Sequence, residues 1–348
     1  MRAIASISLC ALSHNLSIVR SCAPNSKIVC MVKGNAYGHH LELSSPLMQA
    51  DLLAVSELSE AYRLRKLCNK PILLLPGVFA NTELQEAIEL NCQLVLHDLS
   101  QIDIISQTTQ AVRIWIKIDT GMHRLGIKES ELSTCLSQLK QNKNINVECV
   151  MSHFSCADEP GHPKNTQQLN KFNQINVKNI NRSMANSAAI LSLPESHLDY
   201  VRPGIMLYGA SPFSDINEQL MPVMELSAPI LSLKTIKAGE SVGYGASWTA
   251  EKQSNIAIVG IGYGDGYPRH AKSGTPVLIN NTLCSLIGRV SMDLIAVDIG
   301  SLSVKINDRA ILWGNDKLRV ETVASYSDTI AYELLTGVTS RVEFIQRA

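Results

Sequence analysis

The sequence lacks an excess of charge of either sign and has few aromatic residues. Lysine plus arginine and aspartate plus glutamate both number 31, and aromatic residues make up 5% of the 348 positions. Nucleic-acid-binding proteins usually carry a basic surface and often stack bases on aromatic side chains, so the composition argues against a nucleic-acid partner. The 45% hydrophobic content is that of an ordinary globular protein, and the length is enough for two domains.

Long apolar runs and closely paired cysteines are also missing. No apolar stretch approaches the roughly 18 residues of a membrane-spanning helix, so none is expected. The nine cysteines include no C-x-x-C pair, which argues against a metal site or a disulfide framework and favours reduced thiols in the cytoplasm. Arg2 precedes an apolar stretch ending near Leu12, as in a signal peptide, but Ser6 and Ser8 interrupt it. We expect a short strand followed by the start of a helix.

Between residues 27 and 210, short β-type runs alternate with stretches that have helical spacing of apolar residues. The β-type runs are Ile28–Val32, Leu52–Val55, Ile72–Leu75, Gln93–Leu96, Val112–Ile118, Val147–Met151, Asn181–Met184 and Leu198–Val201. The helical stretches include Glu57–Cys68, Thr82–Leu90, Glu129–Lys140 and Asn165–Asn176. Eight such units predict a closed, TIM-like (β/α)8 barrel over residues 9–225, because an open doubly wound sheet more often has about five to seven strands.

After about residue 225 the pattern becomes mostly β. Strand-like runs lie at Ile256–Ile261, Val277–Leu278, Leu283–Ile287 and Leu294–Ile299. Asn280-Asn281 is typical of a hairpin turn, and one helical stretch is expected around Thr322–Leu335. The sequence therefore predicts a second, β-rich domain over residues 226–348, joined by an N-terminal strand at about residues 1–8.

The segment MVKGNAYGHH, residues 31–40, carries the first chemical signal. Lys33 ends a buried strand, where an ammonium is costly to bury unless it is paired or forms a covalent bond. Gly34 and Gly38 open a loop before a helix-like stretch, and Tyr37 adds a phenol that could donate to an anion. Lys33 could simply cap the strand and point into solvent. The alternative is a Schiff-base lysine beside a phosphate-binding tyrosine.

Further motifs follow later strands of the expected barrel, on the face where such barrels carry their active sites. KIDTGMHRLG, residues 117–126, places two cations and a carboxylate around a glycine turn, which could also be a structural ion-pair cluster. His153 could be a hydrogen-bonded core residue or a catalytic one. Ser187 and the Gly204–Ile205 turn offer hydroxyl and N–H groups for a phosphate. With Arg202 added, these are the parts a barrel needs to hold pyridoxal phosphate.

The assembled motifs resemble those of alanine racemases, fold-type III enzymes that use pyridoxal 5′-phosphate. The matching motifs, in order, are MVKGNAYGHH, KIDTGMHRLG, MSHFSCAD, MANSAA, VRPGIMLYG, SVGYGASWT, IGYGDGYPR and IGRVSMDLIAVD. The resemblance runs from near residue 2 to about residue 345. It implies interconversion of L- and D-alanine, supplying D-alanine for cell-wall peptidoglycan, by a cytoplasmic homodimer with shared active sites.

The resemblance also implies roles on the substrate side. Racemisation needs one base on each face of a planar carbanion. Lys33, which would also bind the cofactor covalently, and Tyr244 from the second subunit would be these bases. Arg124 and the backbone of Met292 would bind the substrate carboxylate. Lys117 matches a position that is N-carboxylated in many members and would orient Arg124.

On the cofactor side, the resemblance implies that Arg202 faces the pyridine nitrogen and that His153 supports Arg202. A guanidinium cannot hand over its proton, so the ring nitrogen would stay largely neutral. Tyr263 of the partner subunit would narrow the pocket entrance. The phosphate would be held by Tyr37, Ser187, the N–H groups of Gly204 and Ile205, and Tyr332.

Some positions depart from the usual pattern of the family. Gly34 and His40 replace an alanine and a glycine, and Trp248 stands where a phenol is frequent. One alternative is a racemase of the same fold that prefers serine or accepts several amino acids. Others are a decarboxylase of this fold type and a non-catalytic pyridoxal-phosphate carrier consisting of a barrel alone. The β-rich segment carrying Tyr244 argues against the last two.

Overall fold

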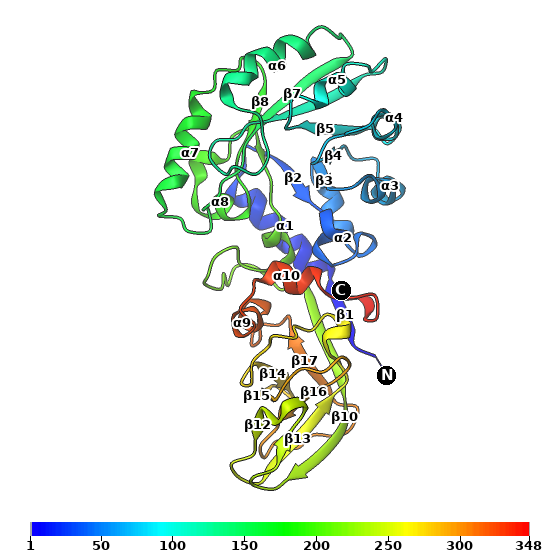
Figure 1. Ribbon diagram of the computed structural model, residues 1–348, viewed down its shortest axis with the longest axis vertical. Coiled ribbons are helices and arrows are strands. Elements are labelled where there is room, and N and C mark those ends of the chain that lie inside the picture. The colour runs from blue at the N-terminus through cyan, green and yellow to red at the C-terminus, as the bar shows by residue number, and fades with distance from the viewer. Residues whose placement is uncertain (1, 348) are drawn as a thin grey trace.

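The computed structural model describes residues 2–347 and shows two substructures along one long axis (Figure 1). One is a closed barrel and the other is an eight-stranded sheet, with α9 (Val320–Tyr326) and α10 (Ala331–Thr336) between them. Met1 and Ala348, the ends of the expected N-terminal strand and of the β-rich segment, lie outside the described residues. Among residues 2–347, none of the helices reaches the length and hydropathy that a membrane crossing requires.

Parallel strands close into the expected barrel, because the first of them pairs with both the second and the last. They are β2 (Lys27–Met31), β3 (Leu52–Val55), β4 (Ile72–Leu74), β5 (Cys92–Leu96), β6 (Val112–Lys117), β7 (Ile145–Met151), β8 (Asn181–Ser183) and β9 (Tyr200–Val201). Each overlaps one predicted run, since barrel strands are covered on both faces and read as continuous apolar stretches. The predicted fold class is confirmed.

The helices of the barrel lie mostly where apolar periodicity placed them. They are α1 (Leu9–Cys22), α3 (Leu58–Leu67), α4 (Asn81–Glu89), α5 (Gln101–Ile105), α6 (Leu132–Leu139), α7 (Pro163–Gln174) and α8 (Ser187–Ser192). The N-terminal prediction is confirmed: β1 (Ile4–Ser8) runs into α1, whose first turn is capped by the Ser8 hydroxyl, which accepts from Ala11 N at 3.2 Å.

The connection from β2 to β3 differs from the expected loop and helix. It consists of the short turn α2 (Lys33–Tyr37) and two 3₁₀ turns, η1 (Leu41–Leu43) and η2 (Ser45–Gln49). His40 has a φ of 65°, which an α-helix cannot accommodate, so a regular helix could not begin there.

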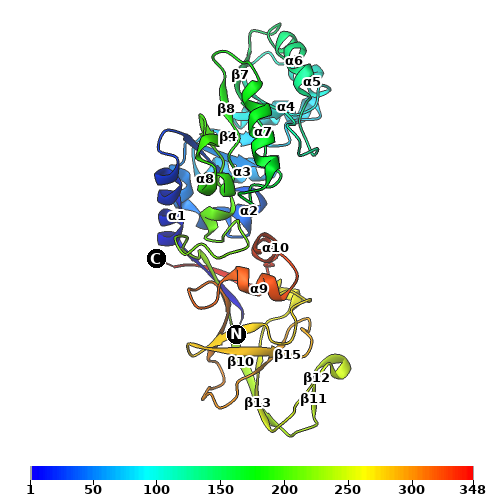
Figure 2. The same cartoon turned by 90° about the vertical axis from the view of Figure 1, so that its left-hand side faces the viewer.

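The second sheet has the strand order β13-β16-β15-β14-β17-β10-β1-β18, and β10 also pairs with β13. Its strands besides β1 are β10 (Met224–Ile236), β13 (Ser254–Val259), β14 (Pro276–Ile279), β15 (Thr282–Ile287), β16 (Ile295–Asp298), β17 (Arg309–Trp313) and β18 (Glu343–Arg347). The expected hairpin turn is confirmed, because Asn280 and Asn281 join β14 to β15 with φ angles of 45° and 64°. A separate hairpin, β11 (Ser241–Val242) with β12 (Trp248–Thr249), projects beside β13 (Figure 2).

The single helical stretch expected around residues 322–335 is two helices, α9 and α10. Asp328 interrupts them with a φ of 49°. The break lets α10 pack against the β2–β3 connection. A Cβ on Gly38, whose φ is +81°, would lie 2.0 Å from the carbonyl oxygen of Leu335.

This contact leads to a first prediction. Gly38→Ala should lower the free energy of unfolding by about 2–4 kcal/mol, because it adds a steric clash to the cost of a left-handed alanine. Gly239→Ala is the matched control, since Gly239 has a φ of +87° but nothing within 4 Å of a Cβ. The control should lose only about 1 kcal/mol. Urea denaturation compares them; equal losses would show that α10 does not press on Gly38.

Candidate active site

A cavity of about 1190 Å³ opens at the carboxyl ends of the barrel strands. Most residues singled out from the sequence line it: Lys33, Tyr37, Lys117, Arg124, His153, Ser187, Arg202, Gly204, Ile205 and Tyr332. The carboxyl ends of parallel strands meet at one end of a barrel, so motifs far apart in the chain converge there. Lys33 therefore contributes to this cavity and is not merely a solvent-facing strand cap.

Lys33 begins α2, a turn that winds left-handed. The φ angles of Gly34, Asn35, Ala36 and Tyr37 are 61°, 54°, 57° and 51°. Left-handed backbone costs L-residues about 1–2 kcal/mol each, so other contacts must hold the turn. Two side chains of α3 do so: Asn35 N donates to Glu60 Oε1 at 2.9 Å, and Arg63 donates to Asn35 Oδ1 at 2.8 Å. The turn brings Lys33 and Tyr37 to the same cavity.

The environment of Lys33 makes its ammonium easier to deprotonate than that of a free lysine. Burial lowers the pKa of its ammonium, the positive charge of Arg124 lowers it further, and Glu60 partly opposes them. A neutral lysine amine is the form that attacks an aldehyde.

Tyrosine and backbone groups form one side of the cavity. Burial raises the pKa of Tyr37 to about 12 and raises that of Tyr332, so both phenols keep their protons and can donate. A Cβ on Gly204 would lie 2.5 Å from the Tyr37 hydroxyl, so only glycine leaves this approach open. The N–H of Gly204 donates to Ser187 Oγ at 2.8 Å rather than pointing freely into the cavity. Ser187 consequently keeps its own O–H to donate, beside the Ile205 backbone.

Arg202 is only 4% exposed, and its guanidinium donates several hydrogen bonds to buried acceptors. It donates to Ser183 Oγ at 2.6 Å, to the Ser152 carbonyl at 2.5 Å and to His153 Nδ1 at 3.3 Å. Arginine has no acceptor, so His153 Nδ1 must accept here and its proton resides on Nε2. Burial and then the charge of Arg202 hold the pKa of His153 well below its ordinary value, so the ring is neutral. Burial lowers the pKa of Arg202 to about 10, and the guanidinium remains charged at neutral pH.

The motif at residues 117–126 divides into a structural part and a cavity-facing part. Asp119 accepts from the N–H groups of Gly121 and Met122 at 2.8 and 3.0 Å and pairs with His123 Nδ1 at 3.0 Å. Lys117 and Arg124 line the cavity instead. Burial, followed by the charges of Arg202, Arg124 and Lys33, lowers the pKa of Lys117 to about 8.

The positive charges of this cavity fit an anionic ligand. Lys33, Lys117, Arg124 and Arg202 all lower the pKa of His153, so four basic side chains lie near this ring. Within residues 2–347, no ion pair engages any of them. Basic side chains without an ion-pair partner, two protonated phenols and the open approach at Gly204 suit a phosphate and a carboxylate, which is what bound pyridoxal phosphate and an amino acid would present.

Three predicted residues lie elsewhere in the chain. Tyr244, Tyr263 and Met292 are 70%, 41% and 52% exposed and do not line the cavity. Tyr244 lies between β11 and β12. Figure 2 shows this hairpin at the end of the molecule away from the barrel. The structure joins the other two, since Gly264 N, next to Tyr263, donates to the Met292 carbonyl at 2.8 Å. Within one chain, none of the three meets Lys33.

Sequence reasoning did not single out two residues that shape the site. Tyr208 stacks on Tyr37 with ring centroids 4.8 Å apart and donates to the Met31 carbonyl at 2.9 Å. Its place in the motif VRPGIMLYG, four positions after Gly204, is the signal that could have revealed it. Glu60 accepts from the N–H groups of Asn35 and Ser56, and its position in an amphipathic helix carries no such signal.

Comparisons with known proteins agree with this arrangement. The family models described as alanine racemase, N-terminal domain, and alanine racemase, C-terminal domain, match residues 7–212 and 223–346. The alanine racemase of Vesicomyosocius okutanii subsp. Calyptogena okutanii is 62% identical over 346 residues, 99% of each chain. The structure of alanine racemase from Acinetobacter baumannii is 42% identical, covers 100% of both chains and superposes with a TM-score of 0.95.

A more distant structure is that of alanine racemase from Bartonella henselae with covalently bound pyridoxal phosphate. It is 28% identical, covers 100% of both chains and superposes with a TM-score of 0.92. The agreement therefore extends over the barrel and the second sheet together. The chain belongs to the alanine racemase family of amino-acid isomerases.

Proposed function

We propose that this chain interconverts L- and D-alanine with pyridoxal phosphate in the barrel cavity and one base on each face of the substrate. The observation that carries the proposal is the cavity itself, which joins a lysine of lowered pKa, two protonated phenols and a buried arginine. The family membership supplies the reaction.

The residues of the cavity suit the parts of this cofactor. Lys33 would bind the aldehyde carbon through its neutral amine. Tyr37, Tyr332 and the Ser187 hydroxyl would donate to the phosphate, together with the Ile205 N–H. Arg202 would face the ring nitrogen and, having only donors, would not give up its proton. When bound, pyridoxal phosphate draws electrons from the substrate Cα and so makes its proton removable.

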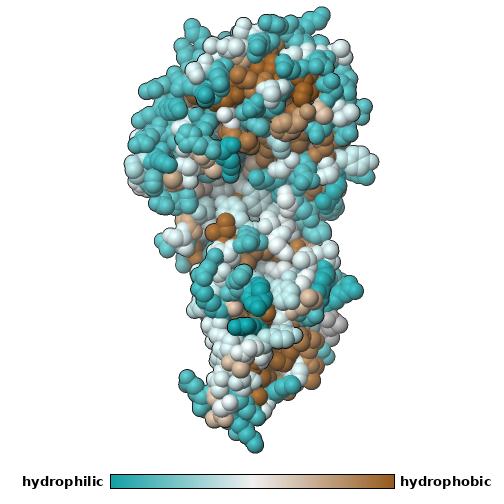
Figure 3. Space-filling model, in the orientation of Figure 1, coloured by the Kyte–Doolittle hydropathy of each residue, from teal (hydrophilic) through white to brown (hydrophobic). Residues whose placement is uncertain are grey.

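We propose that Tyr244 acts as the second base in the cavity of a partner subunit, so that the enzyme is a homodimer with shared sites. Tyr244 is exposed and does not reach the cavity of its own chain, which supports a function between chains. Most exposed large apolar side chains of the described residues lie after residue 230, including Leu283 and Met292. Apolar areas are visible over both the barrel and the sheet (Figure 3), and such areas commonly mark protein interfaces.

On the substrate side, Arg124 and the backbone at Met292 of the partner would hold the carboxylate, and Tyr263 of the partner would narrow the entrance. Lys117 would carry a carboxyl group added from carbon dioxide, a reaction in which a neutral amine gains CO2 and releases one proton. The lowered pKa of Lys117 supports this, because it leaves part of the amine neutral near pH 7. The resulting carbamate would orient Arg124.

The pKa of Lys117 also predicts a pH dependence. Between pH 10.5 and about 8 the folded protein binds fewer protons at Lys117 than the unfolded chain does. The free energy of unfolding should therefore rise with pH through this window. In cofactor-free protein and CO2-free buffer, Lys117→Met should reduce this rise, measured as the thermal midpoint against pH. Identical slopes for variant and wild type would contradict the assignment.

We further propose that the D-alanine formed enters cell-wall peptidoglycan and that the enzyme works in the cytoplasm. The nine cysteines are all free thiols, which suits a reducing compartment.

Incubation of the protein and pyridoxal phosphate with L-alanine tests the function. Chiral chromatography should show D-alanine rising to an equal amount, because the two enantiomers have the same free energy. A parallel panel of amino acids should show alanine as the fastest substrate. If L-alanine yields no D-alanine, the proposed function is wrong.

A further inference from the structure

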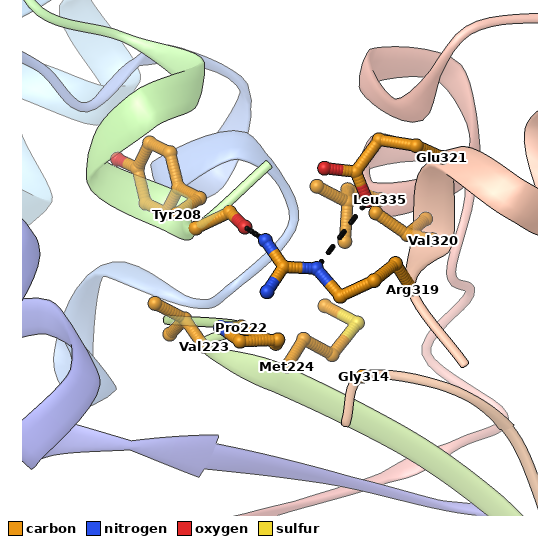
Figure 4. Close-up of a pocket in the computed structure, with 10 residues that line it drawn as sticks. Tyr208, Pro222, Val223, Met224, Gly314, Arg319, Val320, Glu321 and Leu335 are labelled. Atoms are coloured by element: carbon orange, nitrogen blue, oxygen red, sulfur yellow. Dashed lines mark hydrogen bonds and ion pairs between the residues drawn. The ribbon is translucent and has the colours of Figure 1, made fainter. Parts of the chain in front are cut away.

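A buried arginine crosses from the segment before α9 to the last loop of the barrel, residues 209–220. Arg319 is 5% exposed. It donates to the Gly209 carbonyl at 2.8 Å and to the Leu220 carbonyl at 3.0 Å. Figure 4 shows its guanidinium pointing from the α9 side toward the end of the turn that carries Tyr208. A single side chain thus fastens both ends of the loop to the segment between β17 and α9.

Glu321 makes a second crossing at the same place. Its Oε1 accepts from the backbone N–H of Ser211 at 2.7 Å, and its Oε2 lies 3.8 Å from Arg319 Nε (Figure 4). The two side chains are only 6% and 9% exposed. Within residues 2–347, Arg319 Nε and Glu321 Oε2 have no hydrogen-bond partner. Burying such a pair gives little stability in itself. The connection between the two segments therefore rests on the hydrogen bonds from Arg319 and Glu321 to the backbone of the barrel loop.

Arg319 and Glu321 together form a clamp between the two segments. On the barrel side, the clamp contacts Gly209, which is close in sequence to the expected phosphate site. Gly209 follows η5 (Ile205–Tyr208), the turn that begins at Gly204. Tyr208 at the end of that turn stacks on Tyr37. The backbone here has little room to shift, because a Cβ on Gly209 would lie 1.9 Å from the carbonyl oxygen of Met221.

On its other side, the clamp is connected to Tyr332 through α9 and α10. Glu321 lies in the first turn of α9, which packs against α10, and Tyr332 is in α10. The rings of Tyr37 and Tyr332 have centroids 6.1 Å apart. The phenols and N–H groups around the cavity therefore come from two supports, the barrel turns and α10, and six of the eight strands of the second sheet lie between these supports in the sequence.

We propose that Arg319 and Glu321 are positioning residues that hold Tyr332 at the correct distance from Tyr37 and the Gly204–Ile205 turn, so that these groups bind the cofactor phosphate together. This inference rests on the proposed function, since it assigns the phosphate to that site. Neither residue lines the cavity, so the clamp acts only through the groups it positions.

Comparing the affinities for pyridoxal phosphate and for pyridoxal, which lacks the phosphate, tests whether the clamp positions the phosphate-binding groups or only supports the fold. In Arg319→Met/Glu321→Gln, which leaves no unpaired buried charge, the Kd of pyridoxal phosphate should rise by about tenfold or more, the value of one charge-assisted hydrogen bond. The Kd of pyridoxal should change by less than about twofold. Both are measured by absorbance titration of cofactor-free protein.

The matched control is Arg309→Met. Arg309 in β17 also donates to backbone, to the Ser227 carbonyl at 2.6 Å, but within the second sheet. The Arg309→Met protein should bind pyridoxal phosphate with the wild-type Kd. Arg319→Lys, which keeps the charge and a donor, should fold even if the double variant does not and should show a smaller loss confined to pyridoxal phosphate.

The outcomes separate the two hypotheses. Wild-type protein that binds pyridoxal phosphate no better than pyridoxal would refute the phosphate site, and with it the clamp. Wild-type protein that discriminates between them, together with clamp variants of unchanged affinity for pyridoxal phosphate, would overturn the clamp alone. An equal loss of affinity for both compounds would also overturn the proposed clamp, because Arg319 and Glu321 would then support the fold generally.

Discussion

Replacing Lys33 with alanine should lower the rate of alanine racemisation by about 10⁴-fold or more and abolish the visible absorbance of the lysine-bound cofactor. The physical reason is that Lys33 has two functions in the proposal, as the covalent attachment point and as a base. Burial and Arg124 lower the pKa of its ammonium, and the left-handed turn brings it to the cavity. Chiral chromatography of initial rates measures the effect.

Lys27→Ala is the matched control, because Lys27 is exposed and begins the strand that Lys33 follows. Its activity should remain within about twofold of wild type, as expected for a surface substitution. A Lys33→Ala enzyme that kept more than about a tenth of the wild-type rate would exclude this lysine as an essential base.

Replacing Tyr244 with phenylalanine should lower racemisation by about 10²–10⁴-fold in both directions. The two directions must fall together, because the enantiomers have equal free energy. Exchange of the Cα proton in deuterated water should behave differently. Lys33 can still remove and return the proton on its own face, so one enantiomer should exchange without racemising while exchange of the other is lost.

Mass spectrometry of each enantiomer, after chiral separation, gives both exchange rates. Tyr326→Phe is the control: Tyr326 is also an exposed tyrosine after the barrel, and its loss should leave both exchange rates unchanged. Equal exchange of L- and D-alanine by Tyr244→Phe would contradict the assignment of one base to each face.

Much of the barrel and its cavity could be predicted because both depend on local patterns. Apolar runs mark the strands, and the carboxyl ends of those strands converge whatever the connections between them. Lys33, His153 and Arg202 each follow a strand closely, so their meeting in the cavity could be expected.

Features that depend on contacts between distant segments could not be predicted. The left-handed turn at Asn35 relies on a hydrogen bond to Glu60 of another helix. The break between α9 and α10 at Asp328 allows α10 to pack against Gly38, a contact that the local sequence does not indicate. In the sequence, Arg319 looks like an ordinary charged residue before a helix, and its burial is evident only in the folded structure. Tyr244 is a different case, since its proposed place is in a second chain.

Mixing two inactive variants tests the central claim, that Lys33 of one chain works with Tyr244 of another. Lys33→Ala and Tyr244→Phe proteins would be unfolded, combined in equal amounts and refolded with pyridoxal phosphate. Random pairing makes half of the dimers mixed, and each mixed dimer has one site with both wild-type residues. If the active sites are shared in this way, the mixture should recover about a quarter of the wild-type racemisation rate. Refolded mixtures no more active than the separate variants, with wild type refolding to full activity, would contradict it.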